Sequence, residues 1–180
     1  MKKIFILPLF ITMLLVSSCN QEADPSLDPR PLLVNGQFMR LDIQKDRLDA
    51  TDLQNTSFGG PLTNPSGTVV RFEMFVRVSR AGDLISDYLL YDKIYSFPYE
   101  LSVTPASIEA VYAREGIPLT LRNADKIRFV TFSYDSSENK VGYTNLSRTV
   151  QTEAGYKQAY RFNLQVTDQL EAPVNNYEAN

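Results

Sequence analysis

Two short segments contain the carboxylates that could act together in chemistry. They are DATDLQN, with Asp49, Asp52 and Asn55, and DSSEN, with Asp135, Glu138 and Asn139. Such oxygens could bind calcium, and two carboxylates about 5–9.5 Å apart in a cleft could hydrolyse a glycoside. Neither segment has the alternating ligands and distal glutamate of a calcium loop. Because Asp and Asn favour turns, we interpret both segments as turns and predict no metal or other cofactor.

Histidine is absent from all 180 residues, and the only cysteine is Cys19. Histidine is the commonest general base and the commonest metal ligand near neutral pH. Its absence excludes Ser–His–Asp and Cys–His nucleophile sites. We therefore predict that the protein is not an enzyme. A small hydrolase that relies on carboxylates is the remaining catalytic alternative.

Aromatic side chains are the candidates for ligand binding, because sugars stack their C–H faces on exposed rings. Tryptophan is absent. The aromatic candidates are Phe75, Tyr88, Tyr91, Tyr95, Tyr134 and Tyr143, and we select Phe75, Tyr88, Tyr91 and Tyr143 as predicted ligand or interface residues. The alternative is that these rings pack within the core or across strands. Phe75 lies on an otherwise charged strand face, where an exposed apolar side chain would favour an interface.

The N-terminus has the pattern of a secretory signal peptide. Lys2 and Lys3 precede an apolar run at residues 4–16, which the small residues Ser17 and Ser18 follow. The run has 13 residues, whereas a membrane-spanning helix needs about 20. A buried N-terminal helix is the alternative.

Cys19 ends the segment Val16-Ser17-Ser18-Cys19, which resembles a bacterial lipobox. The resemblance implies cleavage after residue 18 and a diacylglyceryl group on the Cys19 thiol, with a further acyl chain such as palmitate on the new amino terminus. One acyl chain gives only marginal membrane binding, whereas two or three make a stable anchor. The resemblance thus predicts a lipoprotein that contacts a membrane through Cys19. A free, buried cysteine is the alternative.

The charge of the mature chain argues against binding to nucleic acid. Removal of residues 1–18 takes away two lysines and leaves 16 basic against 21 acidic residues, a net charge near −5. A nucleic-acid-binding protein needs a basic face. The remaining 162 residues suit a single domain with its own core.

The chain divides into four predicted parts. Residues 1–18 are the signal peptide, 19–36 the lipidated cysteine and an extended tether, 37–166 a folded domain, and 167–180 a loose tail. Residues 21–24, QEAD, could simply make the tether soluble. They also resemble the acidic export signal of Bacteroidetes surface lipoproteins, which implies an exposed position on the outer membrane.

Alternation of apolar and polar residues predicts strands throughout the folded part. In VVRFEMFVRVS the apolar series is Val70, Phe72, Met74, Val76 and Val78. The same period appears in FMRLDI, DYLLYDKI, FPYELSV, DKIRFVTFSY, KVGYTNLSRTV and YKQAYRFNLQV. One helix is predicted, with Thr104 as its cap, Pro105 at its first position and Gly116 at its end. Residues 56–67, TSFGGPLTNPSG, are predicted to form a loop.

These elements predict an all-β fold, an immunoglobulin-like antiparallel β-sandwich with one short inserted helix. Residues 66–166 also resemble the N-terminal immunoglobulin-like domain of Sus-type outer-membrane lipoproteins, in particular the group of the starch-system E lipoprotein. Ser96-Phe97-Pro98, Thr104-Pro105 and Asp125-Lys126-Ile127 carry this resemblance. The usual glycine before the aspartate is Ala124 here, and the usual Asp-Gly turn is extended to residues 135–139.

The resemblance implies an accessory lipoprotein beside a TonB-dependent transporter and its capture lipoprotein. We therefore expect a lipid-anchored, cell-surface protein of the outer membrane that serves a Sus-type uptake complex for glycans or other nutrients. The alternative is a stand-alone module that binds a glycan or a protein.

Overall fold

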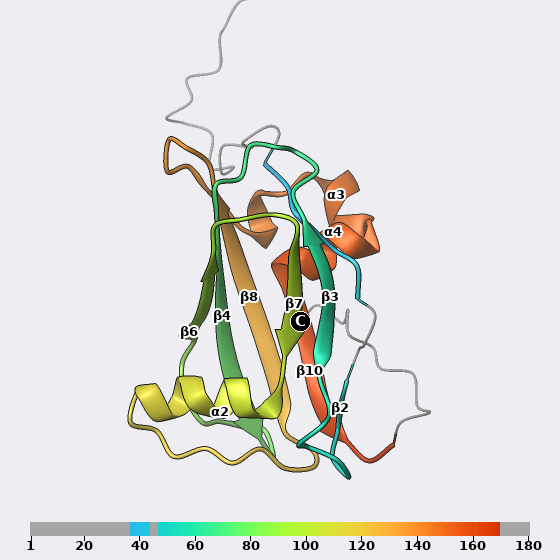
Figure 1. Cartoon of the computed structure of the whole chain (residues 1–180), viewed down its shortest axis with the longest axis vertical. Helices are drawn as coiled ribbons and strands as arrows, with labels where there is room; N and C mark the ends of the chain where they lie inside the picture. Colours follow the sequence, from blue (N-terminus) through green and yellow to red (C-terminus); the bar gives the residue numbers. More distant parts are fainter. Residues whose placement is uncertain (1–36, 44–46, 170–180) are drawn as a thin grey trace, which may run out of the picture. The chain divides into compact units, whose positions relative to one another are not determined.

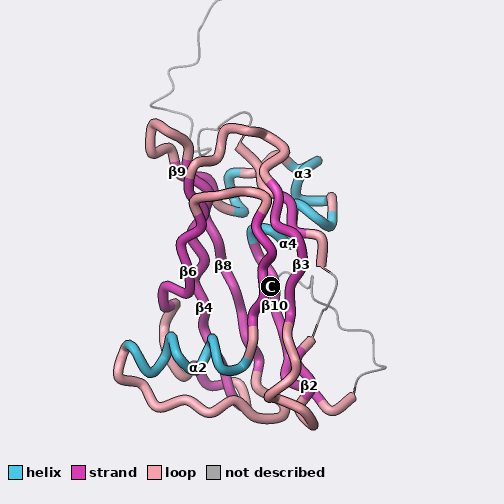
Figure 2. The backbone as a smooth tube through the Cα atoms, viewed as in Figure 1, coloured by secondary structure: helices cyan, strands magenta, loops and turns pink. Residues whose placement is uncertain are grey.

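Strands form most of the fold, in two sheets. A computed structural model describes residues 37–43 and 47–169. The predicted signal peptide, Cys19 and the tether lie outside these residues, as does most of the predicted tail. No helix within the described ranges is long and apolar enough to cross a membrane. Figure 2 shows the strands, in magenta, running alongside one another.

The small sheet has three antiparallel strands in the order β1-β3-β7. Their bounds are β1 (Arg40–Leu41), β3 (Phe58–Thr63) and β7 (Tyr99–Val103). Gly59 lies opposite Ser102 of β7 in this sheet. The two backbones approach so closely that a Cβ atom on Gly59 would lie 1.9 Å from the Leu101 carbonyl oxygen. The β3–β7 pairing therefore requires glycine at this position.

The large sheet has seven strands, with β2-β10-β8-β4-β5 in order, β6 also paired with β4, and β9 with β8. Their bounds are β2 (Leu48–Asp49), β4 (Arg71–Arg80), β5 (Asp83–Leu84), β6 (Leu89–Ile94), β8 (Lys126–Tyr134), β9 (Lys140–Val141) and β10 (Arg161–Thr167). The pairs are antiparallel except that β2 runs parallel to β10.

The two sheets pack face to face through aromatic rings. Phe58 of β3 stacks on Phe162 of β10 with 4.9 Å between ring centroids, and Phe162 stacks on Phe129 of β8 at 4.6 Å. Strict alternation along β8 and β10 places one side of the large sheet in this core. The other side is left for polar and partly exposed side chains.

Helix α2 (Pro105–Arg114) confirms the predicted helix and its signals. The Thr104 side chain accepts a hydrogen bond from the Ser107 N–H, Pro105 is the first helical residue, and Gly116 has a φ of 73° just after the end. Buried Tyr112 connects α2 to the large sheet, because its hydroxyl accepts a 2.7 Å hydrogen bond from the Val78 N–H. The helix lies across one end of the strands (Figure 1).

The prediction of a single helix is wrong. The 3₁₀ helix η1 (Tyr143–Asn145) and the helices α3 (Arg148–Thr152) and α4 (Ala154–Tyr160) occupy much of the two predicted strands at 140–150 and 156–166. Tyr156 and Tyr160 are four residues apart, a spacing that fits both a strand and one face of a helix. The structure has the helix here, at the opposite end of the strands from α2 (Figure 1).

The prediction of a loop at 56–67 is also wrong, because this segment contains β3. Pro61 lies in the middle strand of the small sheet beyond the two β1 pairings with Leu62 and Thr63, and its carbonyl still accepts a 3.1 Å hydrogen bond from the Asp42 N–H, which needs no N–H on proline. Within β4 the buried series Phe72, Met74, Val76 and Val78 is confirmed. Val70, however, is 44% exposed, and Val69 is buried in its place.

Candidate functional site

The outer face of the large sheet holds most of the side chains that could meet a ligand. It is the side away from the core. Its side chains are Arg71, Glu73, Phe75 and Arg77 on β4; Lys126, Arg128, Val130, Phe132 and Tyr134 on β8; and Arg161 and Asn163 on β10. Cationic and aromatic residues therefore dominate this face, although the whole chain has a net charge of −3.

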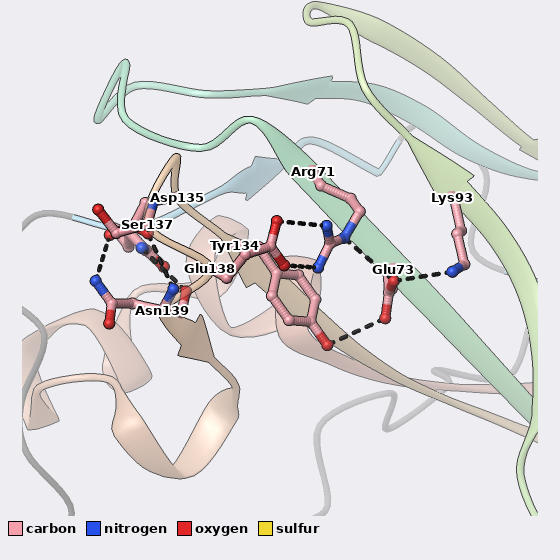
Figure 3. A network of polar contacts seen from close by, with 9 residues as sticks. Arg71, Glu73, Lys93, Tyr134, Asp135, Ser137, Glu138 and Asn139 are labelled. Atoms are coloured by element: carbon pink, nitrogen blue, oxygen red, sulfur yellow. Dashed lines mark hydrogen bonds and ion pairs between the residues drawn. The ribbon is translucent and has the colours of Figure 1, made fainter.

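At one end of this face, cations surround the carboxylate of Glu73. Glu73 is only 8% exposed. Its Oε1 lies 3.2 Å from Arg71 Nε and 3.3 Å from Lys93 Nζ, and its Oε2 accepts a 3.1 Å hydrogen bond from the Tyr134 hydroxyl (Figure 3). The pKa of Tyr134 is raised, mainly because burial desolvates the hydroxyl and secondly because of this hydrogen bond to Glu73. The contacts hold Glu73 as a paired carboxylate within the sheet.

Arg71 connects this network to the turn between β8 and β9. Both terminal nitrogens of its guanidinium donate to the Glu138 carboxylate, and its Cζ lies 4.0 Å from the centroid of the Tyr134 ring (Figure 3). The Arg71 hydrogen bond lowers the pKa of Glu138. Arg71 therefore has its charge balanced by Glu138 and Glu73, an arrangement that favours a structural role.

The two segments that we interpreted as turns use their own side chains to make those turns. Asp135 accepts from the Ser137 N–H at 2.8 Å and from the Asn139 N–H at 3.0 Å, and Asp49 accepts from the Thr51 N–H at 2.8 Å. The Asn55 side chain donates to Asp52 at 2.9 Å. Within the described ranges, no three His, Cys, Asp or Glu residues are grouped so that they could hold a metal ion.

Of the predicted aromatic residues, Phe75 lies at the middle of the outer face. It is half-buried and meets Phe132 edge to face with 5.8 Å between centroids. Phe132 in turn lies beneath Lys140, whose Nζ is 3.6 Å from the ring centroid. The sequence pattern of β8 contained this position, but we did not single out Phe132 as a candidate.

Tyr88 and Tyr143 each lie beneath an arginine. Arg77 Cζ is 4.7 Å from the Tyr88 ring centroid, and Arg161 Cζ is 5.6 Å from the Tyr143 centroid. Such pairs are favourable because the face of an aromatic ring attracts cations. Tyr88 and Tyr143 are half-buried, so the cations and rings together form the surface.

Tyr91 and Tyr95 lie elsewhere. Strand β6 has a bulge between its pairings with Met74 and Phe75, and Tyr91 at this bulge turns towards the core. The centroid of its ring lies 5.2 Å from that of Phe129, and its hydroxyl forms a 2.8 Å hydrogen bond with the Ser107 hydroxyl. Burial raises the pKa of Tyr91. Tyr95 follows β6 directly and is 64% exposed. The structure thus does not bring these two tyrosines together with Phe75.

The opposite end of the outer face has a concentration of positive charge. Arg77 of β4 lies directly opposite Arg128 of β8, and Lys126 is the next outward residue along β8. Within residues 37–43 and 47–169, no carboxylate forms an ion pair with any of these three side chains. The outer face therefore has a charge-balanced end around Glu73 and an unbalanced end around Arg128.

Comparison with known proteins gives no relative to which this site could be matched, since no family model, curated protein or solved structure matches the chain.

Proposed function

We propose that the protein is a lipid-anchored lipoprotein on the surface of the outer membrane. It acts as a non-catalytic accessory subunit of a TonB-dependent, Sus-type uptake complex for glycans or other nutrients. The observation that carries this proposal is the segment that ends in Cys19, where an apolar run, two serines and the cysteine follow two lysines. In this proposal the fold is an immunoglobulin-like sandwich. Two face-to-face sheets of mainly antiparallel strands support this part of the proposal.

The site geometry favours binding over catalysis. Arg71, Lys93 and Tyr134 occupy the oxygens of Glu73, the most buried carboxylate on the outer face. Asp49 and Asp135 accept backbone hydrogen bonds within their own turns. A carboxylate-based glycoside hydrolase would need two carboxylates directed into a common cleft. The carboxylates described here are engaged in local structure instead.

Co-isolation from the native host tests the proposal. A full chain with a C-terminal tag, extracted from membranes in a mild detergent, should bring down a TonB-dependent transporter and its capture lipoprotein. A Cys19→Ala variant should be released from the membrane fraction and should lose these partners. A Cys19→Ala chain that stays in the membrane would contradict the anchor, and a tagged chain recovered alone would contradict the complex.

A stand-alone binding module is the second candidate function. The cationic and aromatic outer face favours it, since Arg77 with Tyr88 and Arg161 with Tyr143 lie on a surface that needs no second subunit to form. In this case the tagged chain would be recovered without a transporter and would still bind its ligand.

A further inference from the structure

The unbalanced end of the outer face is an arrangement that folding alone does not favour. We call Arg77, Lys126 and Arg128 the basic sheet cluster. Like charges that lie directly opposite each other on neighbouring strands destabilise a sheet, and Arg77 and Arg128 are such a pair. Lys126 adds a third positive charge two residues from Arg128 along β8. A sequence selected for stability alone would be expected to place a carboxylate at one of these positions.

Several other arginines in the same domain have a carboxylate partner. Arg80 pairs with Asp125 at 2.7 Å, Arg40 with Asp42 at 2.8 Å, and Arg71 with Glu138. The Nε atoms of Arg71 and Arg128 are both buried without a hydrogen-bond acceptor. However, Arg71 has the carboxylates of Glu73 and Glu138 to balance its charge, whereas Arg128 forms no ion pair within the described ranges. A buried donor without an acceptor destabilises the folded state. The basic sheet cluster therefore lacks the anionic acceptor that Arg40, Arg71 and Arg80 possess.

The surroundings of the cluster indicate what kind of anion would fit. Arg77 lies against the Tyr88 ring, with its Cζ 4.7 Å from the ring centroid. Asn163 of β10, opposite Arg128, adds an amide. The next row along the strands has Phe75 opposite Val130, with Arg161 of β10 on the other side of Val130. A ligand would thus meet a row of cations beside the apolar pair of Phe75 and Val130, which a further arginine flanks, across strands that are spaced by about 4.8 Å.

An acidic sugar unit has both complementary parts. Its carboxylate or sulfate group can accept charge-assisted hydrogen bonds from two guanidinium groups, and its C–H face can contact the apolar pair. A phosphatidylglycerol or phosphatidylserine headgroup would offer the charge without this apolar ring face. Residues of an acidic peptide that carry a carboxylate lack the rigid apolar face next to it. The outer face therefore favours an acidic polysaccharide over these other anions.

We propose that the basic sheet cluster binds the anionic groups, uronate carboxylates or sulfate esters, of an acidic polysaccharide. This inference rests on the proposed glycan-related function and specifies the chemical class of the glycan. Arg77 and Arg128 hold the anionic group between them, Lys126 binds the anionic group of the neighbouring sugar, and the apolar pair of Phe75 and Val130 contacts the sugar ring. Binding of the anion also relieves the repulsion between the two arginines.

Binding of defined polysaccharides tests the inference. The full chain, extracted from membranes in a non-ionic detergent, is applied to immobilised polygalacturonate, which carries carboxylates only, to dextran sulfate, which carries sulfate esters only, and to neutral dextran. We expect binding to at least one acidic polysaccharide, no binding to dextran, and weaker binding as salt is raised. Comparison of the first two probes shows whether the anion is carboxylate or sulfate.

Two matched variants test whether the cluster is responsible. The double variant R77Q/R128Q should raise the dissociation constant at least tenfold. Its melting temperature should change little, because the change removes a repulsive pair together with the favourable contact of Arg77 with the Tyr88 ring. The control R122Q/R148Q removes the same charge from two exposed residues outside the large sheet, and it should leave the dissociation constant within about twofold.

Four results would overturn the inference. They are no binding to either acidic polysaccharide at low salt, equal binding to neutral dextran, equal binding by R77Q/R128Q, or equal binding to polyglutamate or to vesicles with anionic lipids. None of them bears on co-isolation with a transporter. A chain that co-isolates with the transporter but binds no acidic polysaccharide would refute this inference alone. A chain that binds the polysaccharide but co-isolates with no transporter would refute only the proposed complex.

Discussion

Arg80 and Asp125 form a two-point ion pair between β4 and the start of β8. Arg80 Nε donates to Asp125 Oδ1 at 2.8 Å, and Arg80 Nη2 donates to Oδ2 at 2.7 Å. The Asp125 residue is fully buried, and its Oδ2 also accepts from the Arg122 N–H at 3.0 Å. The carboxylate thus joins the loop after α2 to the end of strand β4.

Replacement of Asp125 by alanine should strongly destabilise the protein. The change removes the carboxylate partner of Arg80, which keeps its hydrogen bond to the Thr120 carbonyl, and it leaves the Arg122 N–H without its acceptor. Because breaking a fully buried pair costs about 3–5 kcal/mol and Arg80 is partly exposed, we expect a loss towards the lower end of this range. Equilibrium unfolding in urea measures the loss. The matched change Asp42→Ala removes a half-exposed partner of Arg40 and should cost less than about 1 kcal/mol. Equal losses for the two variants would contradict the structural role of Asp125.

Ala124→Gly should stabilise the protein. Ala124 has a φ of 71°, in the left-handed region that alanine adopts at a cost of about 1–2 kcal/mol and that glycine adopts freely. The greater freedom of glycine in the unfolded chain offsets part of this gain. We expect a gain of up to about 1 kcal/mol in the free energy of unfolding. As a control, Ala110→Gly in the exposed middle of α2 should cost about 1 kcal/mol.

The stability of the protein should fall as the pH rises from about 10 to 12. Burial raises the pKa of Tyr160 to about 12, whereas an unfolded tyrosine has a pKa near 10. The unfolded state therefore releases the proton first, so the contribution of Tyr160 is complete below pH 10 and is lost as the pH passes through 12. Two pKa units correspond to about 2–3 kcal/mol.

Tyr160→Phe provides the control for this pH dependence. At pH 8 the variant should already be less stable, because the buried Ser133 hydroxyl loses its 2.8 Å hydrogen bond with Tyr160. Between pH 10 and 12 its unfolding free energy should fall less steeply than that of the wild-type chain. Urea unfolding at four pH values measures both effects. Equal slopes for the two proteins would show that Tyr160 is not the group that titrates.

The sequence predicted elements well where one local signal was sufficient. The strands around β4 and β8 follow from alternation, and α2 follows from Thr104, Pro105 and Gly116. Prediction from the sequence failed where tertiary contacts determined which of two locally possible structures forms. The segment with Tyr156 and Tyr160 fitted both a strand and a helix, and the glycines of β3 suggested a loop until the close approach of β7 explained them.

Less of the candidate site than of the fold could be predicted from the sequence. Alternation predicted that Phe75, Arg71 and Arg77 share one face, and the structure confirms this arrangement. The opposition of Arg77 and Arg128 depends on the register between β4 and β8, which local patterns do not determine. The inward turn of Tyr91 depends on a bulge in β6 that has no simple signature in the sequence.

Gly59→Ala should destabilise the protein more than Gly142→Ala, although both changes add one methyl group beside a close neighbour. At Gly59 the new Cβ would lie 1.9 Å from a backbone oxygen of β7, which cannot move without breaking the β3–β7 pairing. At Gly142 it would lie 2.8 Å from the half-buried Phe132 ring, which can tilt towards solvent. We expect a loss of about 3 kcal/mol or more for Gly59→Ala and about 1 kcal/mol for Gly142→Ala, measured by urea unfolding. Gly59→Ala with wild-type stability would mean that β3 is not paired with β7 in this register.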